Sequence, residues 1–130
     1  MRILLDTQCW LWLTSAPERF RPEWRERVAS PDTDLFLSAA SAWEIVIKWA
    51  LGKLSLPIGP AEYIPSRLAA TRTASLAVQV SHVLQVASLP PHHRDPFDRL
   101  LIAQAQVERL PILTADRQFD AYDAEVLRAG

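Results

Sequence analysis

The chain has 130 residues, of which 49% are hydrophobic, so we expect one domain over residues 1–130 with a substantial core. No apolar run approaches the roughly 18 residues that a membrane-spanning helix needs, and the first residues do not resemble a signal peptide, which predicts a cytoplasmic protein. A formal net charge of −1 gives no global basic signal for unspecific nucleic-acid binding, although a local basic patch remains compatible with it.

The first half of the chain alternates short apolar runs with longer helical patterns. The runs "RILL" and "LFLS" predict strands at residues 2–5 and 35–38. Helices are predicted over 9–15, 22–30, within 39–54 and over 60–72. The third of these helices begins after the capping residue Ser38 and ends at Gly52, a residue type that favours the position just past a helix.

In the second half of the chain, strands and helices continue to alternate, and prolines mark where several of them begin or end. In "SLAVQVS" at residues 75–81, Leu76, Val78 and Val80 alternate as they would in a strand. A short helix is expected over 82–89 and a longer one over 97–109, which Asp95 caps and Pro96 opens. The run "PILT" predicts a strand at 111–114, and a last short strand is expected near Val126 and Leu127.

Continuously apolar strands that are separated by helices predict an α/β fold with a mainly parallel sheet covered on both faces. In such sheets ligands bind beyond the carboxyl ends of the strands, because the polar ends of neighbouring strands and helices meet there. Polar residues that directly follow a strand are therefore the candidates for a functional site.

Four acidic residues meet this condition although they are distant in the sequence. Asp6 directly follows the first strand, and Asp116 lies two residues after Thr114, at the end of "PILT". Glu44 falls early in the helix after "LFLS", where side chains lean back towards the helix N-terminus. Asp98 occupies the third position of its helix. All four carboxylates can converge on one edge of the sheet.

Each of these acids also has a simpler explanation. Asp6 can cap the next helix, Asp98 can favour a helix dipole, and Asp116 can open a turn. Glu44 is harder to explain in this way, because its helix is otherwise apolar nearly all round. An exposed pair between Glu44 and Lys48 would contribute only about 0.3 to 0.5 kcal/mol, too little to account for the charge.

A cluster of carboxylates repels itself unless a cation compensates for its charge. Hard oxygen ligands of this kind suit Mg²⁺ or Mn²⁺, held by a few carboxylates together with water and substrate phosphate. The sequence therefore predicts a divalent-metal site at this edge.

Four blocks of the sequence carry a family resemblance: "LLDTQCWLW", "SAASAWEIVIK", "HHRDPFDRLLIAQA" and "ILTAD". Together, and in this order, they resemble the PIN-domain family, in particular the toxin ribonucleases of the VapC type. The resemblance covers nearly the whole chain. It implies a three-layer α/β/α sandwich with an acidic, Mg²⁺-dependent site, in which Mn²⁺ can substitute, that hydrolyses RNA phosphodiesters. It assigns the four catalytic acids to Asp6, Glu44, Asp98 and Asp116.

The chemistry of such a site gives a hypothesis for the role of each acid, and the resemblance implies partners. Asp6 and Asp98 would hold the metal, while Glu44 and Asp116 would orient the attacking water or support a second ion. An antitoxin protein would be the cognate partner, and a homodimer is implied. Neither the number of ions nor the RNA that is cleaved follows from the sequence.

Other polar residues leave alternatives open. His92, His93 and Arg94 lie in a proline-rich loop, where they could contact RNA phosphates or simply face solvent. Thr7 and Thr114 could hydrogen-bond the carboxylates or merely end strands.

Two other functions compete with the ribonuclease. The first is a phosphatase with Asp6 as covalent nucleophile, which Gln8 disfavours because such enzymes generally carry a second acid at that position. The second is a non-catalytic adaptor that binds protein or RNA. Loss of metal binding or of metal-dependent activity would favour the adaptor.

Overall fold

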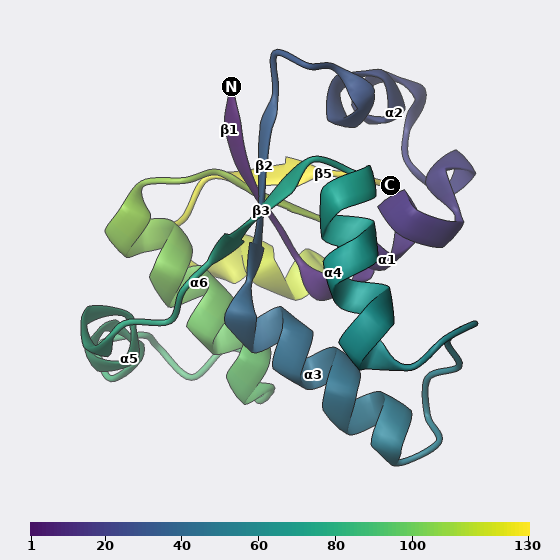
Figure 1. Cartoon of the computed structure of the whole chain (residues 1–130). Coiled ribbons are helices and arrows are strands. Elements are labelled where there is room, and N and C mark those ends of the chain that lie inside the picture. Colours follow the sequence, from purple (N-terminus) through teal and green to yellow (C-terminus); the bar gives the residue numbers. More distant parts are fainter.

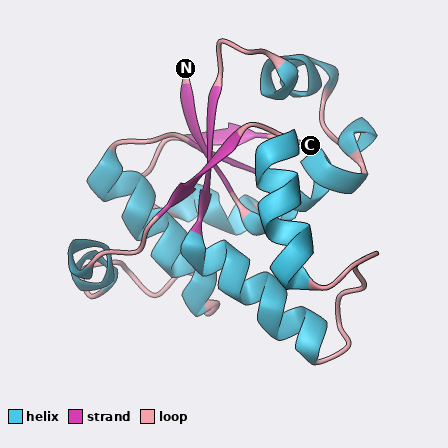
Figure 2. Ribbon diagram, in the orientation of Figure 1, coloured by secondary structure: helices cyan, strands magenta, loops and turns pink.

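The computed structural model describes residues 1–130, and its centre is a five-stranded sheet. The strands are β1 (Arg2–Leu5), β2 (Asp34–Ser38), β3 (Thr73–Leu76), β4 (Ile112–Thr114) and β5 (Val126–Arg128). Their order is β3-β2-β1-β4-β5, and all neighbouring strands are parallel. The expected α/β fold is confirmed, and the sheet is entirely parallel (Figure 2).

Helices connect the strands and surround the sheet (Figure 1). They are α1 (Thr7–Ser15), α2 (Pro22–Ala29), α3 (Ala39–Ala50), α4 (Pro60–Ala70), α5 (Val80–Val86) and α6 (Pro96–Glu108), with two short 3-10 helices at Pro17–Arg19 and Arg117–Ala121. The predicted caps of α3 and α6 are both present. The Ser38 hydroxyl accepts from the backbone N–H of Ala40, and the Asp95 carboxylate accepts from those of Phe97 and Asp98.

The central strand β1 divides the molecule into two cores. Ile3 and Leu5 pack with residues of α1, α2, α3 and α4, whereas Leu4 packs with α6 and the second 3-10 helix. Successive side chains of a strand point to opposite faces, so these three fully buried residues place helices on both sides of the sheet. This is the expected three-layer α/β/α sandwich.

The predicted strand over 75–81 is wrong beyond Leu76. β3 pairs with β2 only as far as Leu76 opposite Ser38, because β2 ends there and the chain continues into α3. Without a neighbour to pair with, the chain turns into α5, at whose start His82 Nδ1 accepts a 3.0 Å hydrogen bond from the Gln79 backbone N–H. The alternation of Val78 and Val80 did not mark a buried face, since Val80 is 74% exposed.

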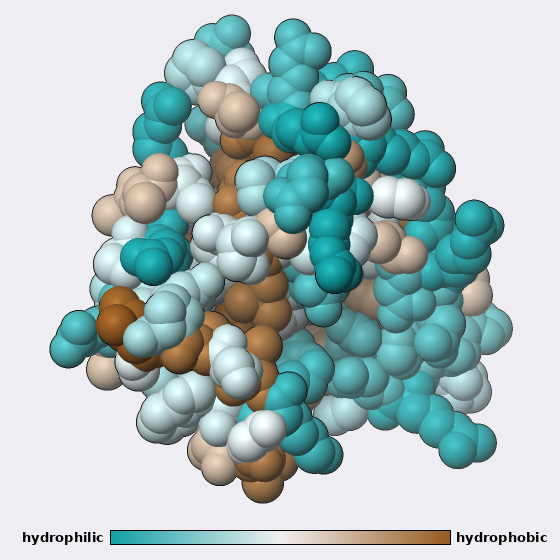
Figure 3. All heavy atoms as spheres, turned by 90° about the vertical axis from the view of Figure 1, so that its right-hand side faces the viewer, coloured by the Kyte–Doolittle hydropathy of each residue, from teal (hydrophilic) through white to brown (hydrophobic).

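Apolar side chains are not confined to the two cores. Figure 3 shows a mainly hydrophilic face on which a strip of apolar residues is nevertheless visible. Large exposed apolar residues include several on α3 and the turn after it: Trp43, Val46, Trp49 and Leu51. None of the helices has the length and apolar character required to cross a membrane.

Candidate active site

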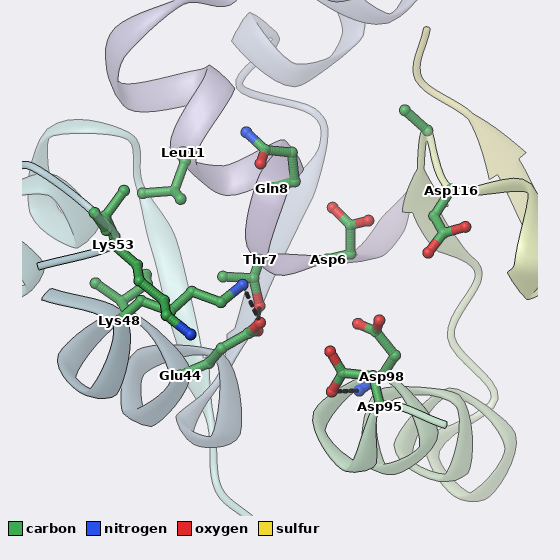
Figure 4. Close-up of a pocket in the computed structure, with 13 residues that line it drawn as sticks. Asp6, Thr7, Gln8, Leu11, Glu44, Lys48, Lys53, Asp95, Asp98 and Asp116 are labelled. Carbon is green, nitrogen blue, oxygen red and sulfur yellow. Dashed lines mark hydrogen bonds and ion pairs between the residues drawn. The ribbon is translucent and has the colours of Figure 1, made fainter. Parts of the chain in front are cut away.

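A pocket of about 480 Å³ opens beyond the carboxyl ends of β1 and β4 (Figure 4). It is lined by Asp6, Thr7, Gln8, Leu11, Glu44, Ile45, Lys48, Lys53, Leu54, Asp95, Asp98, Ala115 and Asp116. All four predicted acids are therefore brought together at one edge of the sheet. Asp95 joins them as a fifth acid.

Asp6 is held rigidly between β1 and α1. Its Oδ1 accepts a hydrogen bond of 2.7 Å from the Cys9 backbone N–H, and its Oδ2 accepts one of 2.5 Å from the Thr114 hydroxyl. Asp6 is thus the N-cap of α1, as the simpler explanation held, and also part of the pocket. Burial raises its pKa above the ordinary range, and the two hydrogen bonds oppose that rise.

Glu44 points from the first half of α3 into the same pocket and is 5% exposed. Its Oε1 accepts a 2.7 Å hydrogen bond from the Thr7 hydroxyl, and its Oε2 lies 2.8 Å from Lys48 Nζ. The pair with Lys48 therefore exists, but it ties a buried carboxylate to a half-exposed cation. It therefore differs from the exposed Glu44–Lys48 pair considered from the sequence, because Glu44 is buried.

Asp98 lies at the N-terminal end of α6, one turn inside its cap Asp95. Burial and the neighbouring charges of Asp95 and Glu44 raise the pKa of Asp98 to about 7, while His93 works in the opposite direction. The predicted capping role of Asp95 is confirmed, because its Oδ1 accepts from the Phe97 backbone N–H at 2.8 Å.

His93 is a member of this cluster that sequence reasoning missed. Its Nε2 lies 3.1 Å from Asp98 Oδ2 and 3.2 Å from Asp116 Oδ2, and its side chain is only 9% exposed. The loop that carries it is therefore not simply solvated. The one available signal was its position five residues before Asp98, which did not reveal that the loop folds back over the acids.

The tautomer of His93 follows from its other ring nitrogen. Nδ1 accepts a hydrogen bond from the Asp95 backbone N–H at 3.1 Å, so the ring proton is on Nε2, the atom that faces the carboxylates. This N–H forms the hydrogen bond to Asp116 Oδ2, and Asp98 Oδ2 lies 3.1 Å from the same nitrogen. Although His93, Asp98 and Asp116 are close enough to surround a cation, His93 is a hydrogen-bond donor in this arrangement rather than a ligand.

Asp116 completes the cluster from the turn after β4. Its Oδ1 accepts from the Gln118 backbone N–H at 2.9 Å, which caps the second 3-10 helix, and its own N–H donates to the Thr114 hydroxyl. Thr114 consequently contacts both Asp6 and Asp116. The open alternatives for Thr7 and Thr114 are resolved: both bind carboxylates of the pocket.

The cysteine and tryptophans occupy different environments. Cys9 and Trp10 are fully buried, and burial raises the pKa of the Cys9 thiol. Trp43 is 62% exposed and contacts Phe97 of α6 in an edge-to-face arrangement. Trp43 and Trp49 are thus surface residues of α3.

The sequence model of the PIN-domain family matches residues 3–125, almost the entire chain. The chain belongs to the PIN-domain family. This PIN domain is 43% identical over 60 residues to "Ribonuclease VapC16" of Mycobacterium tuberculosis, a stretch that is 46% of this chain and 43% of that relative. The chain thus matches less than half of the relative's length.

Solved structures share the fold of this PIN domain. The VapBC2 structure from Rickettsia felis, described as bound to a DNA fragment from its promoter, gives a TM-score of 0.74 at 14% identity over 100% of both chains. FitAcB from Neisseria gonorrhoeae gives 0.60 at 22% identity over 97% of this chain and 96% of the other. At these identities the likeness shows the fold alone.

The side chains of the PIN-domain pocket fit a divalent cation. Five carboxylates line it, whereas its only cationic residues are Lys48 and Lys53. Burial is the main cause of the raised pKa of Asp98, and the nearby charges of Asp95 and Glu44 add to it. Clustered carboxylate oxygens are the donors that Mg²⁺ and Mn²⁺ prefer.

Proposed function

We propose that this PIN domain is a metal-dependent ribonuclease that hydrolyses RNA phosphodiester bonds and serves as the toxin of a toxin–antitoxin pair. The observation that carries the proposal is the convergence of Asp6, Glu44, Asp98 and Asp116 from four different segments into one pocket. Membership of the PIN-domain family and the name of the M. tuberculosis relative support the ribonuclease activity.

Asp6 and Asp98 hold the cation in this proposal, with Mg²⁺ as the expected ion and Mn²⁺ as a substitute. When bound, the ion polarises the scissile phosphate and lowers the pKa of a water molecule. No side chain of the protein then needs to act as a nucleophile. Both oxygens of Asp6 accept hydrogen bonds, which suits a fixed ligand better than the nucleophile of a phosphatase.

The remaining acids position the attacking water. Glu44 and Asp116 offer carboxylate oxygens within the pocket that can accept its hydrogen bonds, and neither carboxylate can rotate freely. The Thr7 hydroxyl and Lys48 hold Glu44, while His93 and the Gln118 N–H hold Asp116. Holding these groups in advance lowers the reorganisation that the reaction requires.

An antitoxin is the proposed protein partner, together with a second copy of the chain in a homodimer. Similar folds are found in solved structures described as VapBC or toxin–antitoxin complexes. The exposed apolar residues of α3, such as Trp43 and Val46, lie on a helix that also supplies Glu44. A partner that covers this helix could place a cationic side chain against the acids and so inhibit cleavage.

Cleavage of RNA tests the proposal directly. The purified protein is incubated with total cellular RNA with and without Mg²⁺, and new RNA ends are mapped by sequencing. We expect Mg²⁺-dependent ends that disappear in Asp6→Asn and Asp98→Asn. The matched control is Asp32→Asn, an exposed acid in the loop before β2 at the opposite edge of the sheet, which should cleave normally.

The same preparations separate the alternatives. Hydrolysis of phosphate monoesters that Asp6→Asn abolishes would favour a phosphatase. Cleavage that persists in EDTA, or equally in both active-site variants, would contradict the proposed metal site. If the protein neither cleaves RNA nor binds a metal ion, the remaining alternative is a non-catalytic adaptor that binds protein or RNA.

A further inference from the structure

Lysine is confined to one place in this protein. Lys48 and Lys53 are the only lysines in the chain, all other basic residues except histidine being arginines, and both lysines line the acidic pocket. No arginine lines that pocket. The pocket therefore has two chemically different sides, because its cations are found only where α3 ends.

The backbone fixes the two lysines next to each other. Helix α3 ends in a Schellman motif, in which the Gly52 N–H donates to the Trp49 carbonyl at 3.1 Å and the Lys53 N–H donates to the Lys48 carbonyl at 2.8 Å. Gly52 has φ +73, a left-handed conformation that returns the chain towards the pocket. The turn thus ties Lys53 directly to Lys48.

The two side chains approach the pocket from the side opposite Asp98 and Asp116 (Figure 4). Lys48 Nζ is 2.8 Å from Glu44 Oε2, and its side chain remains half exposed. Lys53 is exposed and has no ion pair or side-chain hydrogen bond of its own. A cationic edge consequently lies beside Glu44 with ammonium groups accessible to an anion.

We propose that Lys48 and Lys53 form a phosphate subsite, which binds the backbone phosphate of the nucleotide next to the one that is cleaved. This inference rests on the proposed ribonuclease function. An RNA strand that enters a pocket of five carboxylates is repelled, and cations at its edge offset that repulsion for the flanking phosphate. Lysine suits this task, because a compact ammonium on a flexible stem binds phosphate without recognising a base.

Binding of single-stranded RNA at several salt concentrations tests the subsite. The variants are made in an Asp6→Asn background, so that an oligonucleotide cut by the wild type stays intact. Each phosphate contact to a single strand contributes about 0.7 to the slope of log K against log salt, so Lys53→Met should lower this slope by about 0.7. We expect the affinity at low salt to fall about five- to tenfold and Lys53→Arg to restore it.

Arg109→Met is the matched control. Arg109 is an exposed cation at the C-terminal end of α6, whereas Asp98 lies at its N-terminal end, and the substitution changes the net charge by the same amount. Its salt slope should equal that of the parent protein. An equal fall in Arg109→Met and Lys53→Met would show a general charge effect and overturn the subsite.

An RNA with one uncharged methylphosphonate linkage beside the cleaved bond identifies the contacted group. The parent protein should bind it at least as weakly as Lys53→Met binds normal RNA, and Lys53→Met should lose less affinity on this change of linkage than the parent protein does. If the wild type cleaves RNA but Lys53→Met keeps the parent slope, the subsite is wrong and the ribonuclease stands. If the wild type neither binds nor cleaves RNA, the proposed function itself fails.

Discussion

The Thr114 hydroxyl donates a 2.5 Å hydrogen bond to Asp6 Oδ2 and so joins two residues that are 108 positions apart. Thr114 ends β4, Asp6 follows β1, and the two strands are neighbours in the sheet. The same hydroxyl accepts the Asp116 N–H at 2.9 Å. One buried side chain thereby fixes the positions of two acids in the pocket.

Thr114→Val should therefore impair both stability and activity. Valine keeps the shape but leaves Asp6 Oδ2 buried without its donor, which costs about 1–3 kcal/mol of unfolding free energy. We expect RNA cleavage to fall at least tenfold. Urea denaturation and cleavage assays measure the two effects, and Thr114→Ser, which retains the hydroxyl, should keep most of the activity. Equal losses in both variants would contradict the role of the hydrogen bond.

His93→Ala should destabilise the protein chiefly when no divalent cation is present. The Nε2–H group of His93 donates to Asp116 and lies 3.1 Å from Asp98, and its removal leaves the two carboxylates to repel each other. In EDTA we expect a loss of about 1–3 kcal/mol. A saturating divalent cation should reduce that loss, since it neutralises the same acids. Thermal unfolding of wild type and variant in EDTA and in Mn²⁺ provides the comparison, and an identical loss in both conditions would be the contrary result.

Because the pKa of Asp98 is raised, we expect the metal-free protein to lose stability as the pH rises. This pKa is about 7 in the folded protein, against an ordinary value of 3.8, so the folded state binds more protons than the unfolded state between these values. The contribution of Asp98 to the free energy of unfolding therefore decreases as pH rises from about 4 to about 7. Asp98→Asn should unfold at a higher temperature than wild type at pH 8 in EDTA.

The size of that gain and its control follow from the same titration. One pKa unit corresponds to about 1.4 kcal/mol, and we expect Asp98→Asn to gain on the order of 1–3 kcal/mol at pH 8 after allowing for solvent screening. At pH 4, where the wild-type carboxyl is already neutral, the difference should largely vanish. A variant less stable than wild type at both pH values would refute this account.

Gly52→Ala should cost about 1–2 kcal/mol of stability through backbone strain alone. Gly52 has φ +73, and a Cβ added there would meet no atom within 4 Å, so crowding does not contribute. Gly59 is the matched control, because it too has space around it but no positive φ. Gly59 is the N-cap of α4, where alanine is less favoured than glycine, so Gly59→Ala should cost some stability in urea denaturation but less than Gly52→Ala. Equal losses at both glycines would show that the turn geometry is not the cause.

Local patterns were sufficient for most of the fold. The uninterrupted apolar run Ile3–Leu5 predicted a strand buried on both faces, and Pro96 with Asp95 predicted the start of α6. These features are encoded by residues close together in sequence. The strand prediction over 75–81 was wrong beyond Leu76, because the length of that strand depends on where its distant partner β2 ends.

The amino-acid sequence by itself determined which acids are candidates for the site, since each follows a strand or opens a helix whose local signals are clear. Only the tertiary structure decided which groups control those acids. Thr7 meets Glu44, Thr114 meets Asp6, and a loop folds His93 back between two carboxylates. Such contacts join residues distant in sequence, and they depend on strand order, helix orientation and loop path, which no local pattern specifies.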